Sequence, residues 1–220
     1  MHYLRPSKIW PLLFPKFIWS VGDNASKGIC LSFDDGPTPG VTDIVLKILS
    51  EACVPAVFFM TGQAVEKNSS LAKEVRQAGH EIGSHSYSHP DAWKTRPEKW
   101  NQDIQKGQDT IAQILGEEPV WFRPPYGHFI PGLNQVPVHT GMVMWQFMPG
   151  DFDTRVQASD ILSRYKENIQ SGDIVVFHDS LKSKDRIIHS LPSILEWSRQ
   201  ARYEFLTLNS IHNSQNKKSY

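Results

Sequence analysis

The sequence predicts a single-domain α/β fold, a β/α barrel of about seven units, and two observations indicate it. The chain has 220 residues, which is enough for one substantial core and lies within the size range of α/β barrels. Short apolar runs rich in Val, Ile and Phe alternate with longer segments whose apolar residues have helical spacing. Because parallel strands need crossover helices, this repeated alternation favours a barrel over a small open sheet.

The short apolar runs are the predicted strands, and they cover residues 29–33, 56–60, 81–83, 120–122, 142–147, 174–177 and 205–208. The predicted helices cover residues 44–49, 71–78, 104–115, 161–169 and 187–197. Residues 95–98 (Thr-Arg-Pro-Glu) fit a capping box, and Gly79, Gly116 and Gly172 stand where helices should stop. Residues 128–140, which contain three Pro or Gly residues, are predicted to form a loop or broken helix.

The two ends of the chain are expected to lie outside the barrel of residues 28–208. Residues 209–220 are polar and predict a disordered tail. Residues 1–27 include an apolar stretch that Pro11, Pro15 and Lys16 interrupt, so it is a poor signal peptide and too short to span a bilayer. We expect an arm packed on the domain in a cytoplasmic protein without a transmembrane segment, and peripheral association with the cell envelope stays open.

The composition excludes some classes of partner. Lys plus Arg equals Asp plus Glu, at 23 each, so the chain as a whole has no strong electrostatic footprint for nucleic acid or for an anionic membrane. A neutral or locally charged ligand is expected. The two cysteines, Cys30 and Cys53, lie in apolar stretches and are expected to be buried thiols. Composition leaves the oligomeric state open.

Unusual polar side chains follow most of the predicted strands. In a β/α barrel the carboxyl ends of the strands share one face, where the connecting loops form the active site. Side chains far apart in the sequence could therefore converge there. They are Asp34 and Asp35 after the first strand, His85 and His89 after the third, Arg123 after the fourth, Asp151 and Asp153 after the fifth, and His178 and Asp179 after the sixth.

His85 and His89 are four residues apart, the spacing at which one helical turn presents two imidazoles to one metal ion. A carboxylate from another strand end would complete a site with open positions for water and substrate. If Asp35 is that ligand, the repulsion between Asp34 and Asp35 is relieved, and Asp34 can stay ionised beside the cation as a general base. The alternative is a solvated turn, since Asp, Gly and Pro all favour turns.

His178 and Arg123 can each be interpreted as part of the active site or as a purely structural residue. His178 follows a strongly apolar strand and suits a general acid, because its unperturbed pKa lies near neutral pH. It could instead cap a neighbouring loop. Arg123 precedes two prolines that stiffen the backbone, which favours a fixed guanidinium over a surface ion pair.

Three motifs together resemble those of the polysaccharide deacetylase family, also called carbohydrate esterase family 4 or the NodB-homology domain. They are SFDDG at residues 32–36, HSYSH at residues 85–89 and RPPYG at residues 123–127. The resemblance covers about residues 29–208. It implies a distorted (β/α)7 barrel of the TIM type. The resemblance implies that Asp34 is the general base and that Asp35, His85 and His89 are the metal ligands. It implies that Arg123 is the cation that steadies Asp34. The backbone N–H of Tyr126 would bind the oxyanion, and His178 would be the general acid.

Two motifs depart from the family pattern. The fourth usually reads Asp-x-x-Asp-Trp, and here Asp151 and Phe152 match its last two residues, so the resemblance implies that Asp151 orients His178 and that Phe152 lines the acyl pocket. Asp153 is the alternative to Asp151. In the fifth motif Val176 stands where leucine is usual, which implies a slightly different acyl pocket.

The resemblance implies a metal-dependent hydrolase that removes an acetyl group from an N-acetylated saccharide and releases acetate. The expected cofactor is a divalent metal, with zinc first and cobalt, nickel or manganese as alternatives. The same chemistry on an O-acetyl ester, a formamide or another amide of a lipid-linked sugar or small molecule stays open. A non-catalytic, carbohydrate-binding barrel is the alternative from another class.

Overall fold

A computed structural model describes residues 5–22, 27–131 and 140–210, and the predicted β/α barrel is confirmed. Its seven strands form one sheet in the order β5-β4-β3-β2-β1-β6, with β7 also pairing with β1, and every pair is parallel. The strands are β1 (Lys27–Asp34), β2 (Val57–Met60), β3 (Glu81–Ser84), β4 (Trp121–Phe122), β5 (Gly141–Met142), β6 (Ile174–His178) and β7 (Tyr203–Phe205).

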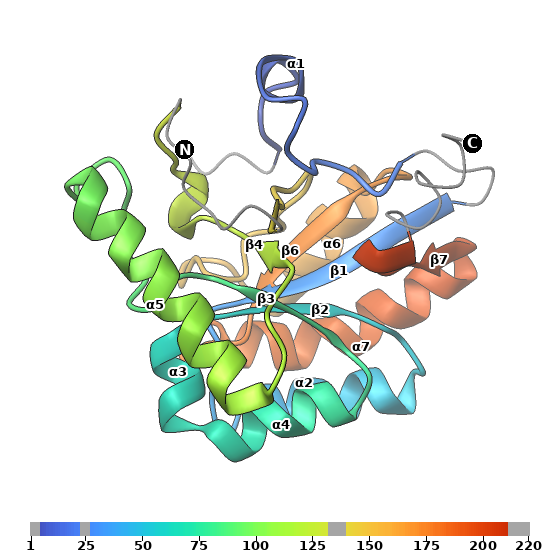
Figure 1. The fold of residues 1–220 in the computed structure, drawn as a ribbon. Helices are drawn as coiled ribbons and strands as arrows, with labels where there is room; N and C mark the ends of the chain where they lie inside the picture. The colour runs from blue at the N-terminus through green and yellow to red at the C-terminus, as the bar shows by residue number, and fades with distance from the viewer. Residues whose placement is uncertain (1–4, 23–26, 132–139, 211–220) are drawn as a thin grey trace, which may run out of the picture.

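Helices connect and cover these strands. They are α1 (Ile9–Leu13), α2 (Thr42–Glu51), α3 (Gly62–Lys67), α4 (Ser69–Gln77), α5 (Pro97–Leu115), α6 (Ala158–Asn168) and α7 (Lys184–Gln200), with a short 3₁₀ helix η1 (Pro125–Gly127). Figure 1 shows α2, α4 and α7 below the sheet, and α1 projecting from the top of the molecule. None of the helices among the described residues is long and apolar enough to cross a membrane.

The barrel closes through one short contact. The chain after β5 approaches β6, where Phe147 and Val175 form a parallel bridge and the Val176 N–H donates to the Phe147 carbonyl at 2.9 Å. The predicted strand of residues 142–147 is therefore only two residues of regular strand, followed by isolated bridges. The barrel is distorted because this side lacks a continuous ladder of strand hydrogen bonds.

The alternation of side chains along each strand separates two cores. One lies between the sheet and its helices and includes Leu31, Phe33, Phe58, Val175 and Phe177. The other lies inside the barrel and includes Cys30, Val57, Phe59, Trp121, Val143 and Ile174. Inward-facing residues near the carboxyl ends of the strands consequently meet above the inner core.

Several local predictions were wrong. Thr95 does not begin a capping box, because α5 starts after Arg96 with Pro97 in its first turn and no side-chain cap. Cys53 is exposed rather than buried, since it lies in the turn after α2 with φ 46°. The last strand ends at Phe205, and the N–H groups of Leu208 and Asn209 donate to the Glu81 carboxylate instead of to a strand.

The N-terminal arm contacts the barrel. The Arg5 guanidinium makes two hydrogen bonds to the Asp173 carboxylate, at 2.9 and 2.6 Å, and Trp19 is buried beside Phe129 and Met144. The expected helix stops at Gly79 and Gly116 both have positive φ, and Gly116 caps α5 in the left-handed conformation. The predicted disorder of residues 211–220 lies outside the described residues.

Candidate active site

Asp35, His85 and His89 form a cluster at the carboxyl ends of β1 and β3. One ligand atom from each of the three side chains lies within 4.8 Å of the others. Asp35 Oδ1 is 3.4 Å from His89 Nε2 and 3.9 Å from His85 Nε2. One carboxylate and two imidazoles at this separation have the donor set and the geometry of a divalent metal site with open positions.

The His85 ring is held in the state that a metal ligand requires. Its Nδ1 lies 2.7 Å from the Arg123 carbonyl oxygen, so Nδ1 carries the proton and donates it there. The other ring nitrogen, Nε2, is therefore unprotonated, and it is the one that faces Asp35. Burial lowers the pKa of His85 to about 4, which keeps the ring neutral at physiological pH. A neutral imidazole with a fixed tautomer is prepared to bind a cation.

The backbone around this cluster adopts conformations that non-glycine residues rarely take. Asp35 has φ 85°, Ser86 64°, His89 60° and Tyr126 60°. Such conformations cost about 1–3 kcal/mol each and persist where the surrounding structure imposes them. Their concentration at one end of the barrel indicates that the loops are shaped for the position of the side chains.

Asp34 lies beside the cluster and pairs with Arg123 inside the barrel. Arg123 Nη1 lies 2.6 Å from Asp34 Oδ1 and 2.8 Å from Ser32 Oγ, while its Nη2 donates to the Met144 carbonyl at 3.2 Å. The guanidinium is fully buried and lies over the Phe59 ring at 4.0 Å. Burial lowers the pKa of Arg123, and the Asp34 carboxylate opposes this change.

His178 and Asp151 form the opposite side of the site. His178 Nδ1 lies 3.0 Å from Asp151 Oδ1, and the His178 N–H donates to Asp151 Oδ2 at 2.7 Å. Burial acts to lower the pKa of His178, but the carboxylate of Asp151 outweighs it, and the pKa rises to about 9. Asp153 instead pairs with Arg155 at 2.7 Å, so Asp151 is the aspartate in contact with His178.

Three predicted substrate-side residues surround these groups. Phe152 packs edge-to-face on His178 with the ring centres 5.4 Å apart. Val176 is fully buried on the same face of β6 as His178, two residues earlier. Tyr126 contacts His89 through its ring, at 4.6 Å, and within the described part of the chain its backbone N–H has no hydrogen-bond acceptor. That N–H is available to a ligand.

Sequence reasoning did not assign a role to Asp179, although it follows His178. Its buried carboxylate accepts hydrogen bonds from the Gly36 N–H at 3.0 Å and the Thr42 hydroxyl at 2.5 Å. A Cβ at Gly36 would overlap that carboxylate, which explains the glycine after the two aspartates. Burial raises the pKa of Asp179 to about 7. Asp179 thus fixes the turn that carries Asp35. In the sequence, the only sign of this role is an acidic residue at the end of a strand.

Comparison with known proteins agrees with this fold. Residues 22–145 match the polysaccharide deacetylase family. The chain is 33% identical over 196 residues to a peptidoglycan-N-acetylglucosamine deacetylase of Bacillus cereus, covering 88% of this chain and 91% of that protein. It is 30% identical to a chitooligosaccharide deacetylase of Azorhizobium caulinodans, covering 69% and 73%. A crystal structure of the Bc1960 peptidoglycan N-acetylglucosamine deacetylase superposes with a TM-score of 0.85 at 26% identity, covering 94% and 96%.

A parallel β/α barrel with polar groups gathered at the carboxyl ends of its strands has the architecture of a barrel enzyme. The chain belongs to the polysaccharide deacetylase family, which confirms the family predicted from the sequence motifs. It is an enzyme that hydrolyses carbon–nitrogen bonds other than peptide bonds. The match over residues 22–145 covers the motifs of Asp34, Asp35, His85, His89 and Arg123, while Asp151 and His178 lie beyond it.

Proposed function

We propose that this protein hydrolyses the acetamide of an N-acetylated saccharide to acetate and a free amine. One observation carries the proposal: Asp34 and His178 are paired residues of β1 and β6 beside the Asp35–His85–His89 cluster. A base and an acid therefore flank one metal site. Two relatives are named as deacetylases of peptidoglycan N-acetylglucosamine and of chitooligosaccharides, which supports the same class of substrate.

Asp35, His85 and His89 would hold the metal, and we propose zinc, because two imidazoles and one carboxylate with open positions suit it. A divalent metal there supplies a Lewis acid that polarises the acyl carbonyl and lowers the pKa of a water molecule. The fixed tautomer of His85 supports this assignment, since its free Nε2 has no proton to lose before binding.

The chain's own groups would carry the proton transfers. Asp34, held in place by the buried Arg123, accepts the proton of the attacking water. The free Tyr126 N–H donates a hydrogen bond to the oxyanion that develops on the acyl oxygen. His178, protonated and oriented by Asp151, gives its proton to the departing nitrogen, because an unprotonated amine is a poor leaving group. The C–N bond then breaks, and acetate and the amine are released.

Acetate release from an N-acetylated chitooligosaccharide tests this function directly. We expect release by the purified protein, loss of release after dialysis against a chelator, and recovery on adding zinc. The same assay on acetylated xylan measures the ester alternative. Failure to release acetate from any N-acetylated saccharide by the metal-loaded protein would contradict the proposal.

Metal binding itself gives a second readout. We expect about one zinc per chain in the wild type and little in His85→Asn, because the variant loses one of three protein ligands. His80→Asn is the matched control, since His80 is another partly buried histidine, placed just before β3 and outside the cluster. Elemental analysis after gel filtration checks the content. Equal zinc in both variants would exclude His85 as a ligand.

The Asp151–His178 pair predicts a pH effect. A general acid must be protonated, so the rate should fall as the pH rises through the pKa of His178, which Asp151 raises to about 9. Asp151→Asn removes the carboxylate charge but not the burial, so the alkaline limb should move to lower pH. A bound cation lowers this pKa in both proteins, and the difference between their pH–rate profiles is therefore the measurement. Coincident limbs would contradict the assignment.

A further inference from the structure

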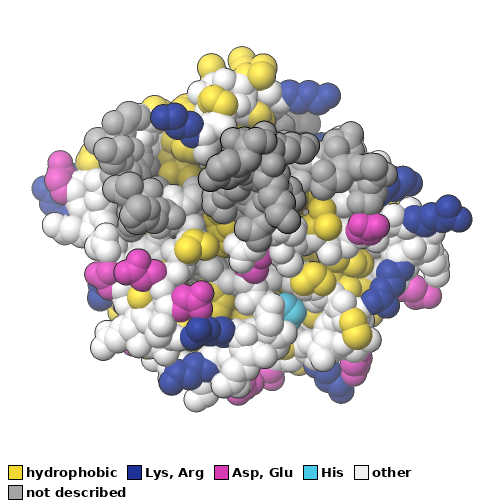
Figure 2. Space-filling view, turned by 45° about the vertical axis from the view of Figure 1, so that its right-hand side comes forward, with side chains coloured by type: hydrophobic (Ala, Val, Ile, Leu, Met, Phe, Trp, Pro, Cys, Tyr) yellow, Lys and Arg dark blue, Asp and Glu magenta, His cyan; other side chains and the backbone are white. Residues whose placement is uncertain are grey.

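The short helix α1 exposes an apolar surface that the barrel does not cover. Leu12 is 79% exposed, Leu13 58%, Ile9 54% and Trp10 40%, and no residue of α1 is buried. Space-filling Figure 2 shows yellow apolar side chains gathered at the top of the molecule, where Figure 1 places α1. Adjacent exposed side chains of this size mark an interaction surface rather than scattered surface residues.

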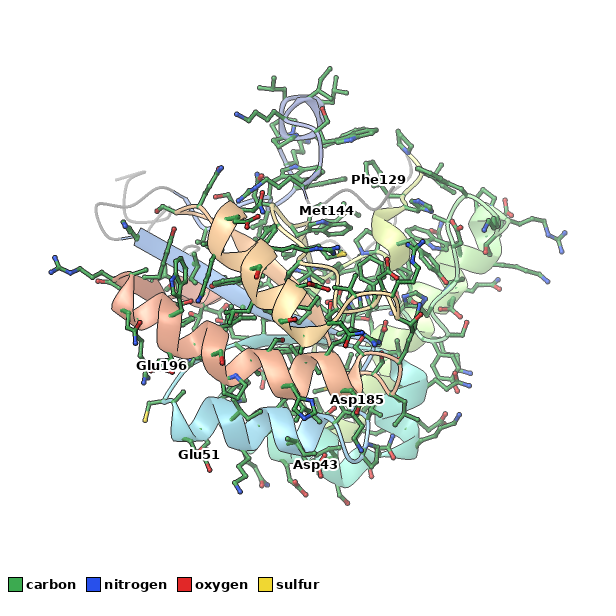
Figure 3. All side chains as sticks on the ribbon, turned by 180° about the vertical axis from the view of Figure 1, so that it is seen from behind. Asp43, Glu51, Phe129, Met144, Asp185 and Glu196 are labelled. Atoms are coloured by element: carbon green, nitrogen blue, oxygen red, sulfur yellow. The ribbon has the colours of Figure 1, made fainter. Side chains whose placement is uncertain are left out.

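The chain after α1 anchors the helix to the barrel. Phe14 stacks on Phe17 at 5.4 Å and meets the edge of Phe129 at 4.7 Å, and its carbonyl accepts a hydrogen bond from the Trp19 indole. Figure 3 shows Phe129 and Met144 directly beneath α1. On the other side the helix follows Arg5, which is held by Asp173. These contacts on both sides of α1 hold the projecting helix on the barrel.

The charged side chains of residues 5–22 are all basic. Residues 5–22 contain Arg5, Lys8 and Lys16 and no Asp or Glu. Lys8 and Lys16 are exposed and flank the helix at its two ends, whereas Arg5 is already paired. The acidic residues labelled in Figure 3 lie on α2 and α7, on the far side of the molecule from α1: Asp43, Glu51, Asp185 and Glu196. An anionic surface could therefore approach α1 without meeting these carboxylates.

We propose that α1 docks on an anionic lipid bilayer, with Ile9, Leu12 and Leu13 entering the headgroup region and Lys8 and Lys16 contacting lipid phosphates. Apolar and Trp side chains with basic neighbours are the signature of a segment that lies in the interface. A five-residue helix also offers much less than the ~800 Å² per partner that a stable protein interface buries. The occupant that fits is a bilayer rather than a second copy of the chain.

Docking would orient the candidate active site. A hollow of about 820 Å³ lies between the arm and η1, and Trp10, Trp19, Tyr126 and Trp145 are among its lining residues. Tyr126 therefore joins the candidate site to the side of the molecule that carries α1. A docked protein would work on material close to the bilayer, whichever acyl group it removes.

Sedimentation with vesicles tests the proposal on the full chain. We expect the wild type to bind vesicles of equimolar phosphatidylglycerol and phosphatidylcholine, and to bind phosphatidylcholine vesicles weakly. The double variant Leu12→Glu/Leu13→Glu should bind the anionic vesicles at least about tenfold more weakly, because it puts two charges into the apolar surface. Salt at about 1 M should also weaken binding, since it shortens the screening length to about 3 Å.

Val120→Glu is the matched control, because Val120 is 47% exposed just before β4 and far from α1 in the chain. It should bind like the wild type. Equal loss in the control and the double variant, or no binding of the wild type to anionic vesicles, would overturn the proposal. A wild-type dimer in solution that the double variant converts to a monomer would overturn it in favour of a second copy. Acetate release from a water-soluble substrate should be unchanged in the double variant, so this outcome is independent of the proposed reaction.

Discussion

Asp34→Asn is expected to lower turnover by about 10²–10⁴-fold, the range of general acid–base catalysis, while the protein still binds one metal per chain. Asparagine keeps the size of the side chain and can still accept a hydrogen bond from Arg123, but it cannot accept a proton from water. The proposed metal ligands Asp35, His85 and His89 are untouched. Steady-state acetate release and elemental analysis on the same preparation measure the two quantities.

Asp153→Asn is the matched control for this prediction. Asp153 also pairs with an arginine at 2.7 Å, but with Arg155, whose side chain is 77% exposed, whereas the carboxylate that bonds to His178 is that of Asp151. Its variant should retain wild-type turnover. Turnover that survives in Asp34→Asn would refute the base assignment, and zinc lost together with turnover would show that Asp34 acts through the metal site.

Arg123→Met is expected to lower the free energy of unfolding by about 3–5 kcal/mol, because it leaves the Asp34 carboxylate buried without its counter-charge. The same change removes hydrogen bonds to Ser32 and to the Met144 carbonyl. Turnover should fall as well, because the guanidinium no longer holds the Asp34 carboxylate in place beside the cluster. Urea unfolding in the presence of a chelator measures the stability without metal.

Arg155→Met gives the corresponding change at a pair of similar length, 2.7 Å, whose arginine side chain is 77% exposed. Its stability should equal that of the wild type within the error of the measurement, because exposed ion pairs contribute little. If both arginine variants unfold at the same urea concentration, the buried Asp34–Arg123 pair does not stabilise the barrel.

The pattern of apolar residues was sufficient to predict the barrel and most of its elements. Strands such as β1 and β6 have runs of apolar residues long enough to be recognised, and their period-two alternation already places Ser32, Asp34, Val176 and His178 on one face. Elements with little apolar signal were missed or misplaced. Helix α3 was not predicted, and β5 is shorter than its apolar run, because tertiary contacts and not local pattern decide them.

The sequence predicted which residues belong to the site better than it predicted which of them contact one another. Residues at strand ends were identified because parallel strands bring their carboxyl ends together. The sequence could not choose between Asp151 and Asp153, since the two differ by two positions in one loop, and only the fold shows that Asp151 contacts His178. Asp179 was named among the strand-end residues but received no role, because its partner Gly36 is distant in the chain.

The order of apolar and polar residues alone thus determined a parallel barrel and the carboxylates, imidazoles and guanidinium at its open end, because burial and periodicity are local properties of the chain. The tertiary structure decided which of these groups touch: the Asp35–His85–His89 cluster, the Asp34–Arg123 pair and the exposure of α1. Distances between side chains from different strands depend on how the barrel closes, and no local pattern contains that information.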